Sequence, residues 1–150
     1  MRVILQRVKH ASVTVDDNIT GQINQGLLIL VGFEPADTQE DFEWTAKKIT
    51  QLRIFNDEND VMNLDVKQIN GELLVVSQFT LHASTKKGNR PSYIKASKPD
   101  VALKQYNLFL SVLEKTAGIE LQTGIFGADM KVELLNDGPV TIFIDSMNKE

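Results

Sequence analysis

Apolar and polar residues alternate with a period of two along much of the chain, as in β-strands whose two faces differ in polarity. The pattern predicts a long first strand over residues 3–15, with apolar groups on both faces and a bulge near Lys9-His10. A short second strand is expected over residues 18–24, and the continuous apolar run over residues 27–33 predicts a buried third strand. Further strands are expected over residues 66–69, 72–79, 121–123, 130–135 and 140–145, with Asn70-Gly71 as a hairpin turn between the first two of these.

Two segments have the 3.6-residue period of amphipathic helices. Thr38 is expected to cap a helix that runs to about Arg53, and Ser97 to open a second helix that Gly118 ends. Pro99 fits the first turn of the second helix, where its missing N–H would have no partner in any case. Many strands with only two main helices predict an α+β fold rather than a doubly wound one. We expect a strongly curved, largely antiparallel, barrel-like sheet.

Length and composition set limits on this fold. A chain of 150 residues is expected to form one domain over residues 1–150, with a core that needs no cross-links. It has no cysteine, which excludes disulfides, thiolate zinc sites and a cysteine nucleophile. The polar loop over residues 56–60 lacks the spacing of a calcium loop, so we expect no metal ion and no cofactor. No apolar run approaches a membrane span of about 20 residues, and the start of the chain lacks a signal peptide, which favours a cytoplasmic protein with no membrane partner.

Charge is unevenly distributed along the chain. The net charge of −4 argues against a general nucleic-acid binder. Between Leu73 and Pro99, however, no acidic residue occurs, and the basic residues there are Lys86, Lys87, Arg90, Lys95 and Lys98. Two interpretations are open: a solvated basic loop, or a rim beside an active site that neutralises the phosphates of a nucleic-acid backbone.

Two short motifs place small polar groups at strand ends, where a rigid scaffold can hold them beside a ligand. They are Ser77-Gln78-Phe79-Thr80-Leu81 and Asn136-Asp137-Gly138-Pro139-Val140-Thr141. Ser77 or Thr80 would need a nearby base to act as a nucleophile. Neither histidine, His10 or His82, supplies one convincingly, although His82 remains a minor candidate. The Gly138-Pro139 segment is either an ordinary hairpin turn or a cis peptide whose parallel carbonyls bind an ammonium group.

Together the two motifs resemble the signature motifs of the D-aminoacyl-tRNA deacylases, which remove D-amino acids from mischarged tRNA. The resemblance extends over nearly the whole chain, through residues 2–15, 26–32, 52–55, 74–81, 86–92 and 124–146. Two departures, Ser84 where many relatives have an acid and Tyr93 where many have Phe, concern the rim and not the motifs. The resemblance implies hydrolysis of the ester between a D-amino acid and the 3′-terminal adenosine of tRNA. Glycyl-tRNA mischarged on tRNA-Ala is a further candidate substrate.

The resemblance also implies a homodimer with two active sites at its interface. Gly138-Pro139 would be cis and would reach into the pocket of the partner subunit, where its main-chain carbonyls would hold the α-amino group of the D-aminoacyl moiety. An L-aminoacyl group would have to direct its side chain into main chain and would be excluded. Many D side chains would be tolerated, because the side chain would point to solvent.

Roles for single residues follow from the same resemblance. Ser77, Gln78, Phe79 and Thr80 form the catalytic motif, whose polar side chains position the ester and the reacting water while backbone donors stabilise the oxyanion. The terminal 2′-hydroxyl of the tRNA is implied to assist hydrolysis, and Thr80 as a nucleophile stays open.

Substrate binding is implied for a second group of residues. Phe126, with Gly127 and Ala128, would bind the terminal adenosine by stacking, and Met130 would line the pocket. Asn136 and Thr141 flank Gly138 and Pro139 in the second motif, and Arg7 would brace this loop. Lys86, Lys87 and Arg90 would form the tRNA rim.

Two alternatives remain open at this point. The first is a serine- or threonine-type hydrolase of small esters, which would act without RNA and lose activity when Thr80 or Ser77 is replaced by Ala. The second is a non-catalytic nucleic-acid-binding dimer, which would bind in a salt-sensitive manner through Lys86, Lys87 and Arg90 without turnover.

Overall fold

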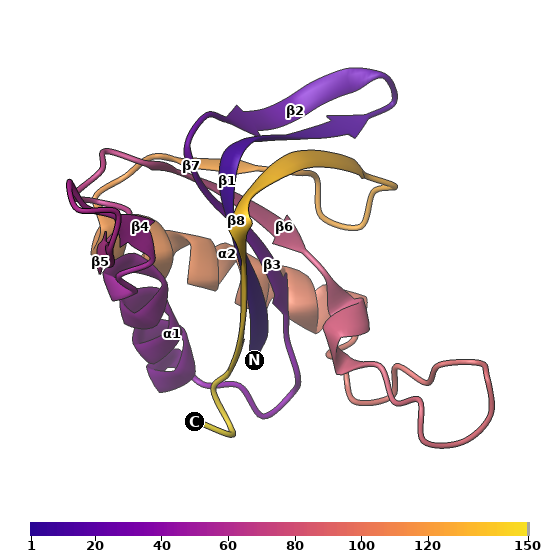
Figure 1. Cartoon of the computed structure of the whole chain (residues 1–150). Coiled ribbons are helices and arrows are strands. Elements are labelled where there is room, and N and C mark those ends of the chain that lie inside the picture. The colour runs from indigo at the N-terminus through magenta and orange to yellow at the C-terminus, as the bar shows by residue number, and fades with distance from the viewer. Residues whose placement is uncertain (150) are drawn as a thin grey trace.

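The long first strand, β1 (Arg2–Val15), is the centre of the sheet in the computed structural model, which describes residues 1–149. β1 pairs antiparallel with β3 (Gly26–Gly32) through its first half and with β2 (Asn18–Ile23) through its second half. Its other edge pairs antiparallel with β8 (Lys131–Asp145) along almost its whole length (Figure 1). The register with β8 shifts between Val8 and His10, which confirms the predicted bulge.

Two parallel pairings extend the sheet. β3 pairs parallel with β6 (Glu72–Ser77), and β6 pairs parallel with β7 (Leu121–Thr123). Helix α1 (Gln39–Gln51) lies in the connection from β3 to β6, and helix α2 (Pro99–Ala117) in the connection from β6 to β7. A strand that returns through a helix lies parallel to its predecessor, so the sheet is mixed rather than uniformly antiparallel.

Close approach of β2 to β7 nearly closes this sheet into a barrel. A Cβ atom at Gly21 of β2 would lie 2.5 Å from the carbonyl oxygen of Thr123 in β7, so only glycine fits there. The predicted α+β fold with two main helices and a barrel-like sheet is therefore confirmed.

Some predicted strand boundaries are wrong. Residues 66–70 form turns instead of the expected strand, and the Gly71 N–H donates to the carbonyl of Val66 at 2.8 Å. β6 therefore has no hairpin partner in residues 66–69 and pairs with β3 and β7. Asn70 has a positive φ of 51°, so the Asn-Gly pair does form a turn. The two strands expected over residues 130–135 and 140–145 are one strand, β8. The remaining short elements are β4 (Phe55–Asn56), β5 (Met62–Leu64) and the 3₁₀ helix η1 (Phe79–His82).

The ends of both helices follow local sequence signals. The Thr38 hydroxyl accepts from the Asp41 N–H while the Asp41 carboxylate accepts from the Thr38 N–H, so the expected cap of α1 is confirmed. At the start of α2, Lys98 occupies the cap position instead of Ser97, whose N–H donates to the carbonyl of Phe33. Gly118 ends α2 with a φ of 65°, as expected.

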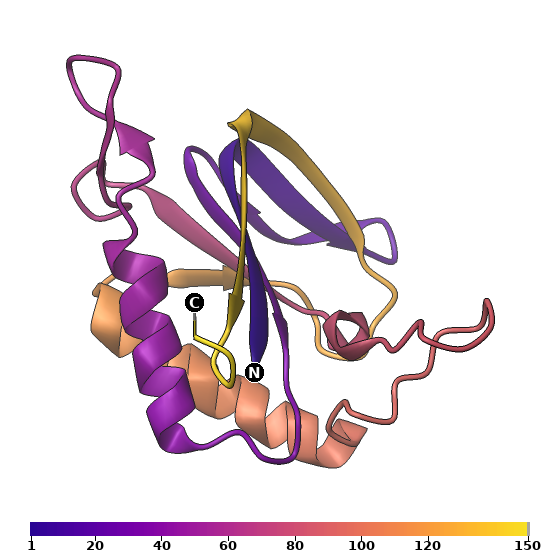
Figure 2. The same ribbon diagram turned by 60° about the horizontal axis from the view of Figure 1, so that its bottom comes forward.

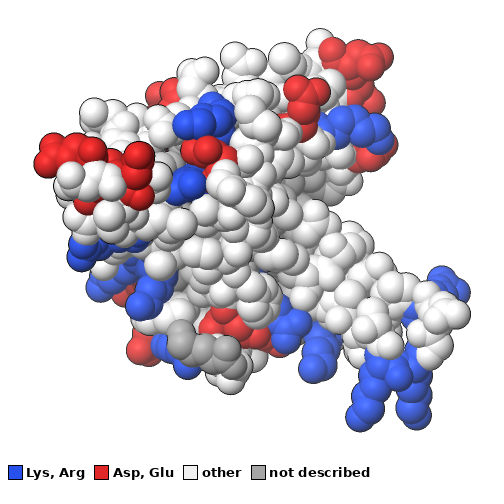
Figure 3. Space-filling model, in the orientation of Figure 1, with Lys and Arg blue, Asp and Glu red and all other residues white. Residues whose placement is uncertain are grey.

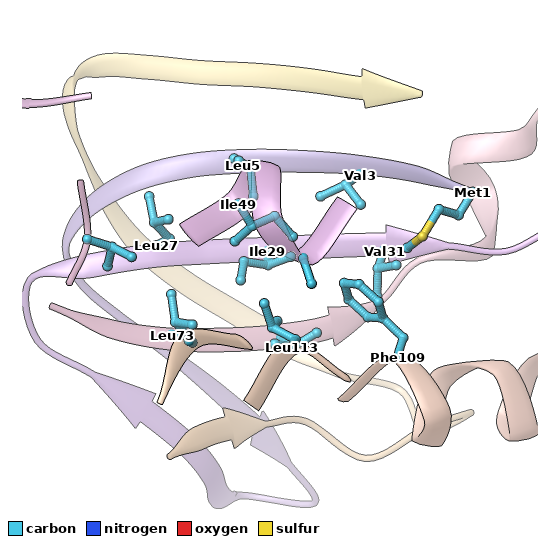
Figure 4. Close-up of a cluster of buried hydrophobic side chains, with 14 of the residues drawn as sticks. Met1, Val3, Leu5, Leu27, Ile29, Val31, Ile49, Leu73, Phe109 and Leu113 are labelled. Carbon is cyan, nitrogen blue, oxygen red and sulfur yellow. The ribbon is translucent and has the colours of Figure 1, made fainter. Parts of the chain in front are cut away.

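Apolar side chains fill both faces of the sheet. Both helices lie on one face (Figure 2). The larger cluster is buried between that face and the helices, and its members in Figure 4 include Met1, Val3, Leu5, Leu27, Ile29, Val31, Ile49, Leu73, Phe109 and Leu113. The smaller cluster lines the inside of the barrel and consists of Val8, Ala11, Val13, Val15, Ile23, Leu28, Leu74 and Val76. Burial on both faces explains why β3 and β6 are nearly continuous apolar runs in the sequence.

The C-terminal end of β8 is held to β1 by an ion pair. Arg2 Nε donates to the Asp145 carboxylate at 2.9 Å, and the two residues are register partners. Burial alone would raise the pKa of Asp145, but the hydrogen bond from Arg2 outweighs it together with a backbone bond from Met147, and the pKa lies below its usual value.

Asp145→Asn is expected to lower the free energy of unfolding by about 0.5–1 kcal/mol at neutral pH, as is typical of partly exposed ion pairs. Because the folded pKa is depressed, this contribution is complete above the unfolded pKa and is lost as the pH falls through the folded one. The difference between wild type and variant in urea denaturation should therefore shrink as the pH is lowered past the unfolded pKa and disappear below the folded pKa of Asp145. Asp129→Asn, which removes the exposed pair with Lys131, is the matched control. A difference that persists at low pH would contradict this assignment.

Candidate functional site

The first motif lies where β6 ends and the chain turns into η1. Gln78 N–H donates to the Val31 carbonyl at 2.7 Å, which continues the pairing with β3 by one residue. The side-chain amide of Gln78 donates to the Thr80 hydroxyl at 2.5 Å. Ser77, Gln78 and Thr80 are half-buried, whereas Phe79 is 56% exposed. The motif therefore presents an oriented hydroxyl on a rigid turn.

Neither histidine provides a base for this hydroxyl. His82 is 1% exposed, and neither of its ring nitrogens has a hydrogen-bond partner among the described residues. His10 is exposed on the bulge of β1. Within residues 1–149, no acidic or histidine side chain hydrogen-bonds to Ser77 or Thr80, and no cluster of three acidic or histidine side chains could hold a metal ion. The chemistry of the motif is that of positioned neutral groups.

The second motif forms an outward excursion in β8. Val8 of β1 pairs with Asn136, and Gln6 pairs with Thr141, so the single residue between them faces the four residues 137–140, here called the excursion. The Asn136 amide donates to the Thr141 hydroxyl at 3.0 Å and accepts from the Val140 N–H at 2.8 Å, which closes the base of the excursion. β8 then continues along the same partner strand, so the segment is not a hairpin turn.

Gly138 and Pro139 are exposed at the tip of the excursion, and the peptide bond between them is cis. Gly138 has a φ of 133°, and a Cβ atom there would lie 2.9 Å from a guanidinium nitrogen of Arg7. Both the backbone conformation and the close approach favour glycine. The tip therefore offers main-chain groups to a ligand.

Arg7 fastens the excursion to the sheet. This residue is 6% exposed, and its Nε donates to the Asp137 carbonyl at 2.8 Å. One terminal nitrogen donates to the Ile54 carbonyl (2.5 Å) and to the Asn56 side chain (3.3 Å). The Asp137 carboxylate lies 3.7 Å from Arg7 Nε and 3.2 Å from Lys9 Nζ. Sequence analysis found Arg7 but missed Lys9, Ile54 and Asn56, because no local pattern signals contacts across such sequence distances.

The segment over residues 124–130 passes beside the end of β6. Phe126 is half-buried, with its ring centroid 5.6 Å from that of Tyr106. The Tyr106 hydroxyl donates to the Val75 carbonyl at 3.0 Å, and burial raises the pKa of Tyr106 to about 12, so it remains a donor. Gly124 N–H donates to the same carbonyl at 3.4 Å. These contacts bring Phe126 close to the first motif, and Tyr106, which is buried on α2, supports it.

The other residues of this segment have separate surroundings. Gly127 is exposed with a φ of 77° in a turn closed by the Ala128 N–H and the Ile125 carbonyl. Ala128 and Met130 are half-buried and pack against the apolar cluster inside the barrel. Phe126 packs against the other cluster, so Met130 and Phe126 approach the site from opposite faces of the sheet.

The strand registers place the two motifs far apart within one chain. Ser77 lies opposite Val31, which lies opposite Val3, whereas Arg7 and the excursion are four residues further along β1. Four residues of strand span about 13 Å, and β6 and β8 are separated by two intervening strands, hence by about 14 Å across the sheet. One aminoacyl group cannot span that separation, so the excursion and Thr80 of the same chain cannot contact the same amino acid.

Beyond η1 the chain forms a projecting basic arm, residues 84–92. Ser84 and Ser92 exchange two backbone hydrogen bonds of 2.8 and 3.0 Å at its base. Lys86, Lys87 and Arg90 are all exposed on it. Basic side chains gather at the lower edge and outer end of the projecting part at the lower right of the space-filling view (Figure 3). The arm therefore extends a positive surface away from the first motif.

The helices of residues 1–149 are all too short or too polar to cross a membrane.

Comparisons with known proteins support a single family. A family model described as D-Tyr-tRNA(Tyr) deacylase matches residues 4–145. Proteins named D-aminoacyl-tRNA deacylase from Parabacteroides distasonis and Flavobacterium johnsoniae are each 65% identical over 150 residues, covering 100% of both chains.

Solved structures share the same fold. One titled c-Myc DNA Unwinding Element Binding Protein is 40% identical with a TM-score of 0.90, covering 97% of this chain and 98% of that one. A probable eukaryotic D-amino acid tRNA deacylase is 16% identical with a TM-score of 0.82, covering 95% of this chain and 97% of its own, which is a likeness of fold alone.

Arg7→Met is expected to lower the free energy of unfolding by about 2–4 kcal/mol, because it leaves the buried Ile54 carbonyl and the partly buried Asp137 carbonyl without their donor. Urea denaturation monitored by circular dichroism measures this change. Arg53→Met is the matched control, since Arg53 is exposed and donates to a single carbonyl, that of Asn63. Equal small losses in both variants would show that Arg7 does not fasten the excursion.

Proposed function

We propose that this chain, which belongs to the D-Tyr-tRNA(Tyr) deacylase family, hydrolyses the ester bond between a D-amino acid and the 3′-terminal adenosine of tRNA. The observation that carries this proposal is the 65% identity, over the full length of both chains, to proteins named D-aminoacyl-tRNA deacylase. The activity is that of a hydrolase of carboxylic esters, exerted by one domain over residues 1–150, in the cytoplasm where tRNA is charged.

The tip of the excursion is the proposed binding site for the α-amino group. Gly138 and Pro139 are exposed there and present main-chain carbonyls, which accept hydrogen bonds from an ammonium group. Arg7 holds the preceding carbonyl, that of Asp137, and so fixes the orientation of the tip. With the amine and the ester both held, an L-amino acid would have to direct its side chain into the main chain, and it is rejected by steric exclusion.

A homodimer would complete the site. The separation of the two motifs within one chain supports a partner subunit as the source of the excursion that faces Thr80, and two-fold symmetry then produces two sites. β8 also exposes apolar side chains on either side of the excursion, with Leu135 51% and Phe143 56% exposed. A depression lined by Trp44, Leu52 and Phe143 extends this surface. Exposed apolar surface of this kind marks protein–protein contacts.

In the proposed mechanism, the first motif positions the reacting groups. Ser77, Gln78 and Thr80 orient the ester and the attacking water, with Phe79 at the entrance and backbone donors at the developing oxyanion. The terminal 2′-hydroxyl of the tRNA assists, which agrees with the absence of a base beside Thr80 within residues 1–149. A nucleophilic Thr80 would need such a base, so the role of its hydroxyl is positional.

Other residues bind the RNA. Phe126, Gly127 and Ala128 hold the terminal adenosine, with Met130 lining the pocket, while Asn136 and Thr141 maintain the base of the excursion. Aromatic stacking on a base contributes about 1–3 kcal/mol and tolerates any sequence. Lys86, Lys87 and Arg90 on the basic arm neutralise phosphates of the acceptor stem. Glycyl-tRNA fits the same site, because glycine has no side chain to exclude.

A non-catalytic nucleic-acid binder is the second candidate. The exposed basic arm favours it, as does the name of the solved structure at 40% identity, which describes a DNA-binding protein. It predicts salt-dependent binding without turnover. A small-ester hydrolase is less well supported, because no base accompanies the hydroxyls of Ser77 and Thr80 among the described residues.

The purified protein is expected to hydrolyse D-tyrosyl-tRNA much faster than L-tyrosyl-tRNA in metal-free buffer. Release of labelled tyrosine measures both rates. Equal hydrolysis of the two esters would favour an unselective esterase, and hydrolysis of neither would favour the non-catalytic binder.

Gly138→Ala is expected to reduce the ratio of D- to L-ester hydrolysis by at least about tenfold, since the new Cβ would meet Arg7 and displace the tip. The ratio is informative because a loss of folded protein lowers both rates equally. Gly118→Ala is the matched control, because it also places Ala at a positive φ but meets no atom within 4 Å. An unchanged ratio in Gly138→Ala would place the source of selectivity elsewhere.

A further inference from the structure

Three apolar side chains are exposed together where the basic arm joins η1. Phe79 is 56% exposed, Tyr93 38% and Ile94 88%. The rings of Phe79 and Tyr93 meet edge to face, with centroids 5.0 Å apart and an interplanar angle of 74°. We call these three residues the root patch.

Charge around the root patch has a single sign in the sequence. Residues 73–99 contain no acidic residue, and Lys95, which follows the patch directly, is exposed. The Ser84–Ser92 pairing closes the arm beside the patch, so Lys86, Lys87 and Arg90 lie in a loop whose two ends meet there. An apolar surface whose charged neighbours along residues 73–99 are all basic fits a ligand that is flat, apolar and attached to phosphate.

We propose that the root patch binds an unpaired nucleobase of the tRNA, one that precedes the terminal adenosine. This inference rests on the proposed function and adds a second base-binding site to that of Phe126. The 3′ end of a tRNA is single-stranded, so its bases are free to stack on protein side chains. The occupant is RNA rather than a second subunit, because an apolar subunit contact would not need a border of cations.

The position of the root patch agrees with the direction in which the RNA must leave the site. Phe79 lies between Gln78 and Thr80, which hold the ester in the proposed mechanism. The nucleotides that precede the terminal adenosine continue from that point toward the acceptor stem, whose phosphates the basic arm would bind. The root patch lies between these two contacts, and Tyr93 and Ile94 are substrate-binding residues outside the catalytic motif.

Only substrates longer than one nucleoside would reach the root patch, which gives the proposal its test. Tyr93→Leu is expected to raise KM for D-tyrosyl-tRNA about tenfold, the equivalent of one lost stacking contact, with kcat within about twofold of wild type. Hydrolysis of D-tyrosyl-adenosine, which has no further base, should be unchanged. Tyr93→Phe retains the ring and should behave as wild type toward both substrates.

Three results would overturn the proposal. An unchanged KM for the tRNA in Tyr93→Leu would remove the root patch from RNA binding. Equal losses on D-tyrosyl-tRNA and D-tyrosyl-adenosine would mean that Tyr93 supports the catalytic motif through Phe79. A change of oligomeric state in size-exclusion chromatography, with loss of both activities, would identify the patch as a subunit contact.

A binding measurement separates failure of this inference from failure of the proposed function. Wild type and Tyr93→Leu are titrated with an uncharged single-stranded RNA that ends in CCA. About tenfold weaker binding by Tyr93→Leu supports the root patch even if no ester is hydrolysed, and equal binding overturns it even if the deacylase activity is present.

Discussion

The register between β1 and β8 is the constraint on which the rest of the site depends. Because Val8 pairs with Asn136 and Gln6 with Thr141, one residue of β1 must face four residues of β8, and the surplus backbone is forced outward. The excursion is thus a consequence of pairing on both sides of it, unlike a free loop. β1 also pairs with β2 and β3, so three strands hold it in place. The excursion is attached to this rigid strand.

Burial of a cation determines how the excursion points. A guanidinium that is almost inaccessible to water must be fully paired, and the partners of Arg7 come from two distant segments, residues 54–56 and the excursion itself. Displacing the Asp137 carbonyl would leave both it and Arg7 unsatisfied. Lys9 adds a second, exposed cation at the Asp137 carboxylate, which is a weaker constraint. The requirement that buried Arg7 be paired thus also fixes the main-chain groups at the tip of the excursion.

The features that were predicted correctly are those that depend on interactions between residues close together in the sequence. The capping residues of α1, the glycine that ends α2, the bulge in β1 and the two polar motifs are all encoded within a few neighbouring residues. The parallel pairing of β3 with β6 was not predicted. The turn at Asn70-Gly71 was assigned to a hairpin, because an Asn-Gly pair indicates a turn but not whether the flanking segments pair with each other. The support of Arg7 by Ile54 and Asn56 and of Phe126 by Tyr106 depends on contacts between distant segments, which periodicity cannot reveal.

The proposed recognition through the main chain has a consequence for how selectivity can be lost. A carbonyl at the tip of the excursion is the same whatever side chain its residue carries, so substitutions at the tip act through geometry and not through lost functional groups. The sensitive positions are therefore those that determine geometry: glycine at 138, where any Cβ would meet Arg7, and Arg7 itself. The hydroxyl and amide groups of the first motif are uncharged, as are the carbonyls of the tip. Both parts of the proposed site would therefore act by orienting the substrate. Such a site depends on the rigidity of the sheet more than on the acidity of any residue, which agrees with the attachment of both motifs to strands of the main sheet, β6 and β8.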